Sequence, residues 1–189
     1  MCLKELDNKI SNCRKCDLYK TRTNTVPGDG NPDSDILFIG EAPGRNEDLK
    51  GKPFVGKAGQ VLDTLLDSIG LDRKDVFIAN ILKCRPPNNR NPFRDEIKLC
   101  TGFLDKQIQI IQPKVIVPMG NFASSYILEK YGLKKDSISM IHGKKYEVNT
   151  LSNKIFIVPI FHPAVATYDK NKMVYMEKDF KKISEYIKS

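Results

Sequence analysis

Short apolar runs and helical apolar spacings alternate along the chain, and they predict strands and helices in turn. Four compact runs are rich in strand-forming residues and occupy residues 35–40, 76–81, 114–120 and 155–159. Because such runs are apolar on both faces, they are typical of buried strands in a parallel sheet. We expect residues 146–148 to form a short edge hairpin and the polar segment 21–35 to be a loop.

The predicted helices have apolar residues three or four positions apart. Gly70 and Pro113 are placed to end two of them, and Asn121 is the expected N-cap of a helix that continues to Tyr131. The inner faces of the other helices are formed by Leu3, Leu6 and Ile10, by Leu62, Leu65, Leu66 and Ile69, by Ile97, Cys100, Leu104, Ile108 and Ile111, and by Met173, Met176, Phe180, Ile183 and Ile187.

Strands that alternate with helices predict an α/β protein, a three-layer α/β/α sandwich with a mostly parallel four-stranded central sheet. The length of 189 residues suits one domain spanning residues 1–189. In open sheets of this kind, ligands bind at the carboxyl ends of the strands. Those ends carry Glu41, Asn80, Gly120-Asn121 and His162, so we expect these segments to converge on one cleft.

Composition narrows the class of protein and suggests the charge of its partner. With 40% hydrophobic and 29% charged residues, the chain is typical of a globular protein and not of collagen or a disordered chain. The net charge of +8 favours a polyanionic partner or an anionic surface. The sequence has no run of about 18 apolar residues, and it begins with charges where a signal peptide would be apolar, so we expect no membrane association and a cytoplasmic location.

The five cysteines of the chain are an odd number, which in a reducing compartment points away from disulfides and toward metal ligands, a redox pair or buried small residues. Cys13 and Cys16 form a C-x2-C pair, and Cys84 lies at a strand exit where a ligand is favoured over a core residue. Cys100 is either a fourth ligand or a small apolar residue on its helix face. Spacing alone leaves zinc and a [4Fe–4S] cluster both open, and Cys2 is interpreted as a spare thiol.

The other candidate groups each have a structural alternative. The loop after residue 40 resembles a phosphate-binding turn but lacks the G-x-G-x-x-G and Walker patterns, and the acidic residues in and after it fit a carboxylate that positions water or faces a developing cation. His162 is either a hydrogen-bond donor in the cleft or a core histidine, while His142 is interpreted as a turn residue. Phe54 is either a core residue or a stacking platform, and Asn80 either caps backbone groups or recognises the edge of a base.

Several long motifs in order, covering residues 2–165, resemble the family-4 uracil-DNA glycosylases. The motifs are Gly40-Glu41-Ala42-Pro43-Gly44 with Glu47-Asp48, then Gly51-Lys52-Pro53-Phe54-Val55-Gly56-Lys57-Ala58-Gly59, then Asn80-Ile81-Leu82-Lys83-Cys84-Arg85-Pro86-Pro87 with Asn89-Arg90 and Pro92, and finally Phe161-His162-Pro163.

The resemblance implies the uracil-DNA glycosylase fold and an enzyme that removes uracil from DNA by hydrolysing its N-glycosidic bond, with no lyase step. It implies Glu41 as the residue that positions water, His162 as the donor to the leaving uracil, and Asn80 and Phe54 as the residues that select and stack on the base. Gly40, Ala42, Glu47 and Asn89 are implied as further substrate-binding residues. Cys13, Cys16, Cys84 and Cys100 are implied to hold a [4Fe–4S] cluster, with zinc the less favoured metal.

Partners follow from the same resemblance. We expect activity on single-stranded DNA and on U·G and U·A pairs, with phosphates contacted by Arg85, Arg90, Lys57 and Lys170. After His162-Pro163 the chain departs from the family's Leu-Arg-Asn-Pro-like stretch, and Tyr168 is the candidate wedge. We expect a monomer in a bacterial or archaeal cell, and a sliding-clamp contact is not identifiable from the sequence. The alternatives are a non-catalytic iron–sulfur or zinc DNA-binding module and a nucleotide-phosphate enzyme.

Overall fold

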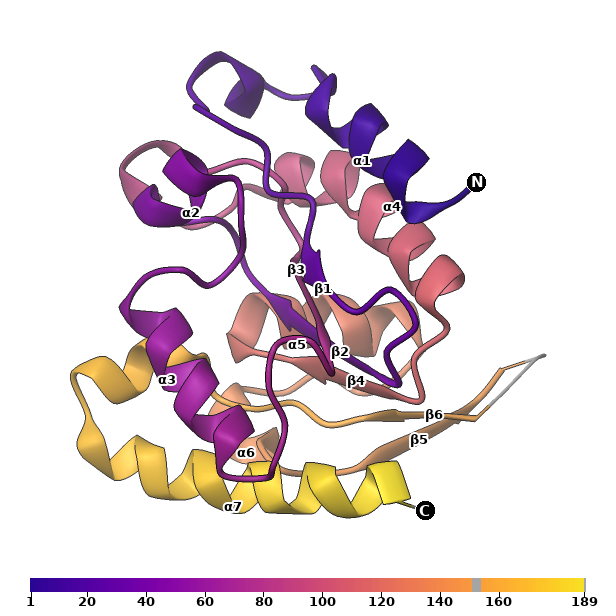
Figure 1. Ribbon diagram of the computed structural model, residues 1–189, viewed down its shortest axis with the longest axis vertical. Helices are drawn as coiled ribbons and strands as arrows, with labels where there is room; N and C mark the ends of the chain where they lie inside the picture. Colours follow the sequence, from indigo (N-terminus) through magenta and orange to yellow (C-terminus); the bar gives the residue numbers. More distant parts are fainter. Residues whose placement is uncertain (151–153, 189) are drawn as a thin grey trace.

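The computed structural model describes residues 1–150 and 154–188, and within them six strands form one mixed sheet in the order β1-β3-β2-β4-β6-β5 (Figure 1). The strands are β1 (Asp29–Gly30), β2 (Ile36–Gly40), β3 (Phe77–Asn80), β4 (Val115–Pro118), β5 (Tyr146–Asn149) and β6 (Lys154–Ile157). The α-helices are α1 (Leu3–Ser11), α2 (Arg45–Lys50), α3 (Lys57–Asp67), α4 (Arg94–Ile111), α5 (Gly120–Lys130), α6 (Ile138–Ile141) and α7 (Lys170–Lys188). Short 3-10 helices are η1 (Asp17–Lys20), η2 (Pro87–Asn89) and η3 (Pro163–Thr167).

The four predicted strands are confirmed as the parallel centre of the sheet, β3-β2-β4-β6. The sheet is larger than the predicted four-stranded one, because two antiparallel strands border this centre. β5 pairs with β6, as the expected edge hairpin requires. β1 lies inside the predicted loop and escapes a periodicity search because it has only two residues, one of them a glycine whose missing side chain lets the strand approach the Val76 carbonyl.

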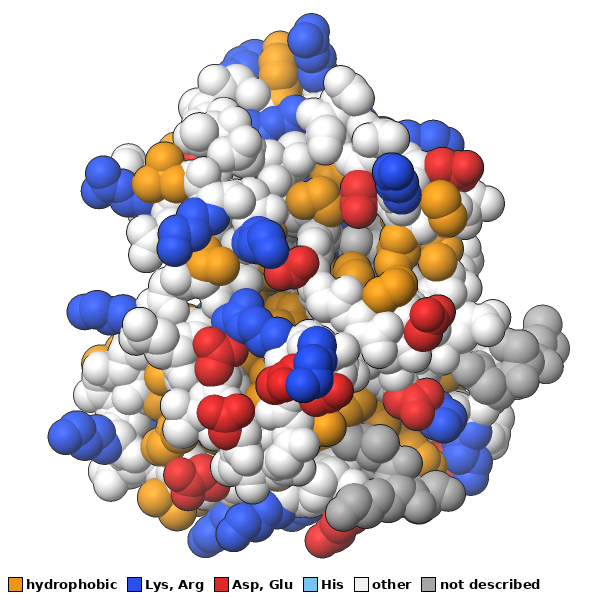
Figure 2. Space-filling view, viewed as in Figure 1, with side chains coloured by type: hydrophobic (Ala, Val, Ile, Leu, Met, Phe, Trp, Pro, Cys, Tyr) orange, Lys and Arg blue, Asp and Glu red, His pale blue; other side chains and the backbone are white. Residues whose placement is uncertain are grey.

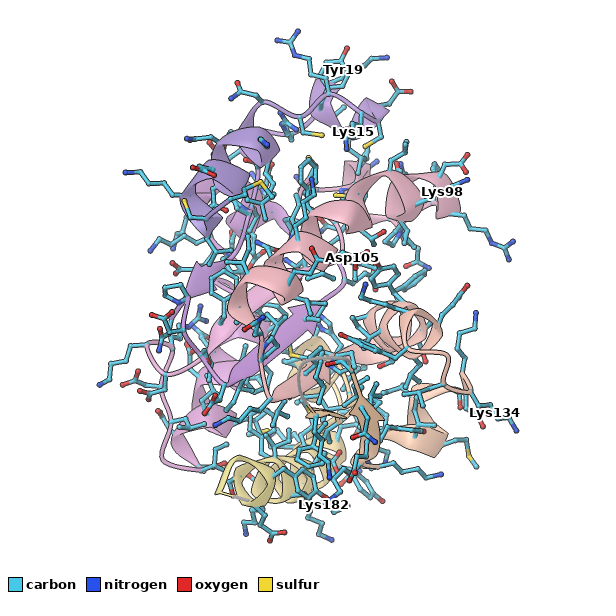
Figure 3. The ribbon with its side chains drawn as sticks, turned by 90° about the vertical axis from the view of Figure 1, so that its right-hand side faces the viewer. Lys15, Tyr19, Lys98, Asp105, Lys134 and Lys182 are labelled. Atoms are coloured by element: carbon cyan, nitrogen blue, oxygen red, sulfur yellow. The ribbon has the colours of Figure 1, made fainter. Side chains whose placement is uncertain are left out.

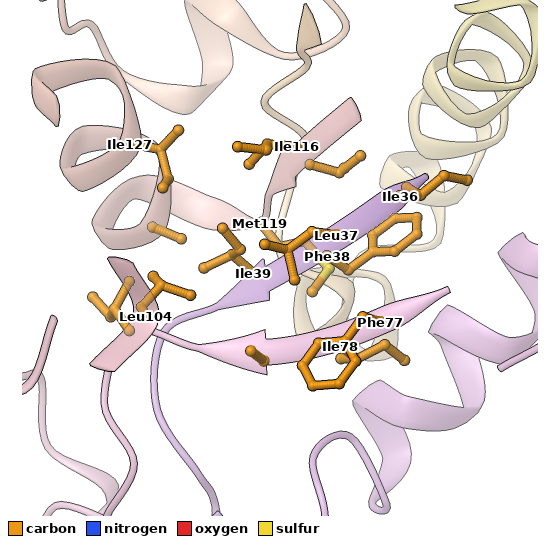
Figure 4. Close-up of a cluster of buried hydrophobic side chains, with 14 of the residues drawn as sticks. Ile36, Leu37, Phe38, Ile39, Phe77, Ile78, Leu104, Ile116, Met119 and Ile127 are labelled. Atoms are coloured by element: carbon orange, nitrogen blue, oxygen red, sulfur yellow. The ribbon is translucent and has the colours of Figure 1, made fainter. Parts of the chain in front are cut away.

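Helices cover both sides of the sheet, with α3 and α7 on one side and α4 and α5 on the other (Figure 1). Side chains of β2 alternate between these layers, since successive residues of a strand point to opposite faces. Figure 4 shows Leu37 and Ile39 on the side of Ile127, and Phe38 on the opposite side. There the Phe38 ring stacks on Phe180 of α7, with 5.6 Å between ring centroids. The three-layer arrangement therefore places apolar residues on both faces of β2.

Two predicted helix ends differ in the structure. Asn121 is not an N-cap, because α5 begins at Gly120 with Met119 as its N-cap. The Asn121 side-chain oxygen instead accepts a hydrogen bond of 2.9 Å from the amide of Ile138, which joins α5 to α6. Helix α3 ends at Asp67, and Gly70 turns the chain three residues later with a φ of +74°. The predicted α7 face is buried as expected at Met176, Phe180 and Ile183, while the side chain of Ile187 lies outside the described residues.

Basic side chains are spread over the face drawn in Figure 2 and do not gather in one patch. Among the described residues, no helix is both long and apolar enough to cross a membrane.

Replacing the fully buried Phe180 by alanine should lower the free energy of unfolding by about 3–5 kcal/mol, because the variant loses the stacking on Phe38 and leaves a cavity between α7 and the sheet. Urea denaturation measures the change. The matched control is Val174→Ala on the same helix, where the side chain is 52% exposed and a change within about 0.5 kcal/mol is expected. Equal effects of the two substitutions would contradict this account of the core.

Candidate active site

A pocket of about 350 Å³ opens at the carboxyl ends of the central strands, where the sequence predicted a cleft. It gathers segments that lie far apart in the chain, because parallel neighbours deliver their carboxyl ends to the same edge. Of the predicted catalytic and substrate-binding residues, seven line it: Glu41, Ala42, Glu47, Phe54, Asn80, Asn89 and His162. Pro43, Gly44, Ala58, Pro86, Arg90 and Ala164 complete the lining.

Gly40 lies beneath the pocket and explains how Asn80 and Phe54 approach each other. It pairs with Asn80 across β2 and β3, and a side chain at position 40 would overlap the Asn80 side-chain oxygen and the Phe54 ring. Asn80 is 2% exposed, and among the described residues its side-chain oxygen has no hydrogen-bond partner. A buried acceptor without a partner costs about 1–3 kcal/mol, so this oxygen is suited to accept a donor from a ligand.

Phe54 sits in a backbone conformation that is unusual for a side-chain-bearing residue, with a φ of +52°. The loop that carries it is fixed on one side by Glu47, whose carboxylate oxygen Oε1 accepts hydrogen bonds from the amides of Val55 at 2.8 Å and Gly56 at 3.0 Å. Glu47 therefore shapes the pocket wall through its carboxylate as well as lining the pocket.

The His162 ring faces Phe54, with 5.6 Å between ring centroids. Its Nδ1 atom accepts a hydrogen bond of 3.2 Å from the amide of Ala164, which leaves the proton of the neutral ring on Nε2. Desolvation by the surrounding protein lowers the pKa of His162 from 6.5 to about 4, while the Glu47 carboxylate acts in the opposite direction. His162 is thus a neutral Nε2–H donor at physiological pH.

Glu41 continues from β2 into the pocket wall. Its backbone carbonyl accepts a hydrogen bond of 3.0 Å from the amide of Leu82, which extends the contact between the ends of β2 and β3. Desolvation raises the pKa of the Glu41 carboxyl above its usual 4.5. Among the described residues Glu41 forms no ion pair, so its negative charge is left available to a positive centre in the pocket.

The loop after β3 supplies Asn89 and Arg90 to the rim. The Asn89 side-chain oxygen accepts a hydrogen bond of 2.7 Å from Arg85. Arg90 donates two hydrogen bonds to the Glu96 carboxylate, at 2.9 and 2.6 Å, and lies over the Phe93 ring. Both predicted phosphate-contacting arginines are therefore held in place by side chains of their own loop and of α4.

Two acidic or basic residues noted in the sequence lie outside this pocket. Asp48 is buried, and its carboxylate accepts hydrogen bonds from the amides of Thr23 and Asn24, which fixes the preceding loop. His142 lies in the turn directly after α6, as predicted. Its Nδ1 atom lies 2.7 Å from the Asp179 carboxylate oxygen Oδ2 on α7. Its partner lies 37 residues away in sequence, and no local pattern indicates the pair.

The four predicted ligand cysteines line a second pocket, at the junction of α1, α4 and the loop after β3. Figure 3 places Lys15 and Tyr19, which also line it, at the end of the molecule opposite Lys182. The cysteines are free thiols, and Cys84 and Cys100 accept hydrogen bonds from the Arg22 side chain at 3.1 Å and the Lys83 amide at 3.3 Å. Burial raises the pKa of the Cys100 thiol to about 12.

The four cysteines are arranged around one pocket and not around one point. A zinc site holds its thiolates about 2.3 Å from one point. Among the described residues, no group of three or more Cys, His, Asp or Glu side chains gathers round a point in this way. The four cysteines instead surround a pocket with largely apolar walls, and donors already face two of their sulfurs. Four thiols around one pocket are a donor set for a metal group that binds thiolates.

Sequence comparison places the chain in a known class. The family model of the uracil DNA glycosylase superfamily matches residues 27–188. The chain is 50% identical over 183 residues to the type-4 uracil-DNA glycosylase of Archaeoglobus fulgidus, covering 97% of this chain and 92% of the relative. It is 47% identical to that of Sulfurisphaera tokodaii (97% and 84% covered) and 40% identical to that of Thermotoga maritima (97% and 93% covered). The chain belongs to the uracil-DNA glycosylase superfamily, and within it to the type-4 enzymes.

Sequence reasoning missed Arg73, which lies behind Phe54 and outside the pocket. It stands in a turn of ordinary charged residues after α3, and no spacing or motif there indicates a contact with the Phe54 loop.

The ring of His162 should titrate near pH 4 and carry its proton on Nε2 at neutral pH, because burial and the Ala164 amide both disfavour the imidazolium. Between pH 6.5 and 4 the unfolded chain binds a proton that the native protein does not, so this group lowers stability as the pH falls. Long-range ¹H–¹⁵N NMR of the two histidines measures the titration, with His142→Gln to assign the signals. A midpoint near 6.5 for His162 would contradict this reading of the pocket.

Proposed function

We propose that the protein hydrolyses the N-glycosidic bond of uracil in DNA, releasing uracil and leaving an abasic site. The observation that carries the proposal is the single pocket that contains a desolvated carboxylate, a neutral histidine donor, a buried amide and an aromatic ring, from Glu41, His162, Asn80 and Phe54. Membership of the type-4 family supports the same activity.

Bond cleavage develops positive charge on the sugar and negative charge on the departing base. The Glu41 carboxylate faces the positive sugar and orients the attacking water, and its burial strengthens the interaction because little solvent screens it. His162 donates its Nε2 proton in a hydrogen bond to uracil O2, where negative charge accumulates. A neutral donor of low pKa stabilises this anion by hydrogen bonding.

Selection of uracil rests on the amide of Asn80. Its unpartnered oxygen accepts the N3–H of uracil, and its nitrogen donates to O4. Cytosine has an acceptor at N3 and a donor at N4. Its acceptor would face the Asn80 oxygen and its donor would face the Asn80 nitrogen, so neither pair would form a hydrogen bond. Phe54 stacks on the flipped base, and Gly40 leaves room for the ring and the amide to share the pocket floor.

Arg85, Arg90, Lys57 and Lys170 contact the DNA phosphates in this proposal, and Arg90 lines the pocket. Tyr168, the most exposed large hydrophobic side chain among the described residues at 77%, fills the space left by the flipped base. Flipping is easiest from single strands and mismatches, so single-stranded DNA and U·G pairs are substrates together with U·A pairs. The proposed reaction is a hydrolysis without a lyase step.

Cys13, Cys16, Cys84 and Cys100 would hold a [4Fe–4S] cluster. When bound, it supplies four thiolate bonds that tie the segment after α1 to α4 and to the loop after β3. This loop continues into the pocket rim at Asn89, so the cysteines support the rim from behind.

Removal of the Asn80 amide should reduce uracil excision about 100- to 1,000-fold, since one hydrogen-bonding group of the transition state is lost. A labelled oligonucleotide with one uracil is incubated with the protein, and alkali then cleaves the strand at any abasic site. The control for Asn80→Ala is Asn149→Ala on the exposed edge strand, which should leave the rate unchanged. If the unaltered protein cleaves the uracil strand no more than a thymine strand, the proposed function is wrong.

The protein purified without oxygen should be brown and contain about four irons and four sulfides per chain. Cys84→Ala should lose the visible absorption, whereas Cys2→Ala should keep it, because Cys2 is exposed and does not line the cysteine pocket. Iron, sulfide and zinc analysis measures the content. A colourless protein with one zinc per chain would overturn the cluster.

A further inference from the structure

Phe54 is held from behind by a charged pair that the proposed mechanism does not use. The guanidinium of Arg73 donates a hydrogen bond to the Phe54 carbonyl oxygen through Nη2, and another of 3.1 Å to the Pro53 carbonyl through Nη1. Its Nε donates to the carboxylate of Asp63 on α3 at 2.6 Å. One guanidinium thus joins two successive carbonyls of the loop to a rigid helix.

The backbone of Phe54 needs such support. A phenylalanine with a φ of +52° is strained by about 1–3 kcal/mol and persists only where its surroundings fix it. Gly59 of α3 packs so closely against this carbonyl that a side chain there would overlap the Phe54 oxygen. Relaxation to an ordinary φ would rotate this carbonyl away from Arg73 and swing the ring from its place beside His162.

We infer that Arg73, fixed by Asp63, is a positioning residue that holds the Phe54 ring in the geometry for stacking on the substrate base. This inference rests on the proposed function. Arg73 does not line the pocket, so it acts only through Phe54. Lysine cannot replace it, because one ammonium group lacks the planar fork that reaches two carbonyls and a carboxylate together.

The test compares excision by Arg73→Met and Arg73→Lys with Lys114→Met, a control that breaks the exposed Lys114–Asp35 ion pair. Misplacement of the ring should lower kcat/KM on a single-stranded uracil oligonucleotide about 10- to 100-fold in both Arg73 variants, with little change in the control. The same substitutions are then made in a Phe54→Ala background, where loss of Arg73 should change kcat/KM by less than about twofold. Thermal melting shows that each variant is folded at the assay temperature.

Hydrogen exchange of the Val55 amide measures positioning without catalysis. Val55 follows Phe54 in the same loop, and its amide donates to Glu47 of α2, so it should exchange at least about tenfold faster in Arg73→Met than in the control. Equal kcat/KM for Arg73→Met and Lys114→Met, equal losses with and without the Phe54 ring, or unchanged exchange would each overturn the inference. Absence of excision by the unaltered protein would refute the proposed function, and the exchange rate would still decide the role of Arg73.

Discussion

The parallel pairing of β2 with β3 and β4 is the constraint on which the rest of the structure depends. Every residue of β2 is buried, and its neighbours on both sides run in the same direction. The hydrogen-bond register sets Gly40 opposite Asn80, and the next bonds beyond the strands continue it into Glu41. A chemical site can form at this edge because the backbone ladder fixes where each strand stops.

The pocket at that edge desolvates one acidic and one basic side chain, Glu41 and His162. Desolvation raises the pKa of Glu41 and lowers the pKa of His162, so in each case the charged form is disfavoured. In the proposed reaction, cleavage of the glycosidic bond places a cation near the Glu41 carboxylate and an anion near the His162 imidazole. Under this proposal, the site is better matched to the separated charges of the reaction than to the neutral substrate.

The pocket wall at Phe54 is held by contacts from other segments of the chain. Glu47 holds the amides of the Phe54 loop, and Arg73 holds its carbonyls. Gly40 and Gly59 allow the close approaches that no side chain would permit. These contacts fix the ring that forms one wall of the pocket, and the wall lies in a loop with no sheet hydrogen bonds of its own.

The sequence by itself determined the four central strands, the helices between them and the gathering of Glu41, Asn80 and His162 at one edge. Apolar periodicity is a local signal, and parallel strands bring their carboxyl ends to the same edge. The sequence also grouped the four cysteines that line the second pocket. Only the tertiary structure decided the edge strand β1, the pairing of His142 with Asp179, the tautomer of His162 and the support of Phe54 by Arg73. Each of these depends on a contact between residues distant in sequence, or on burial by the whole fold, and neither leaves a pattern in the neighbouring residues.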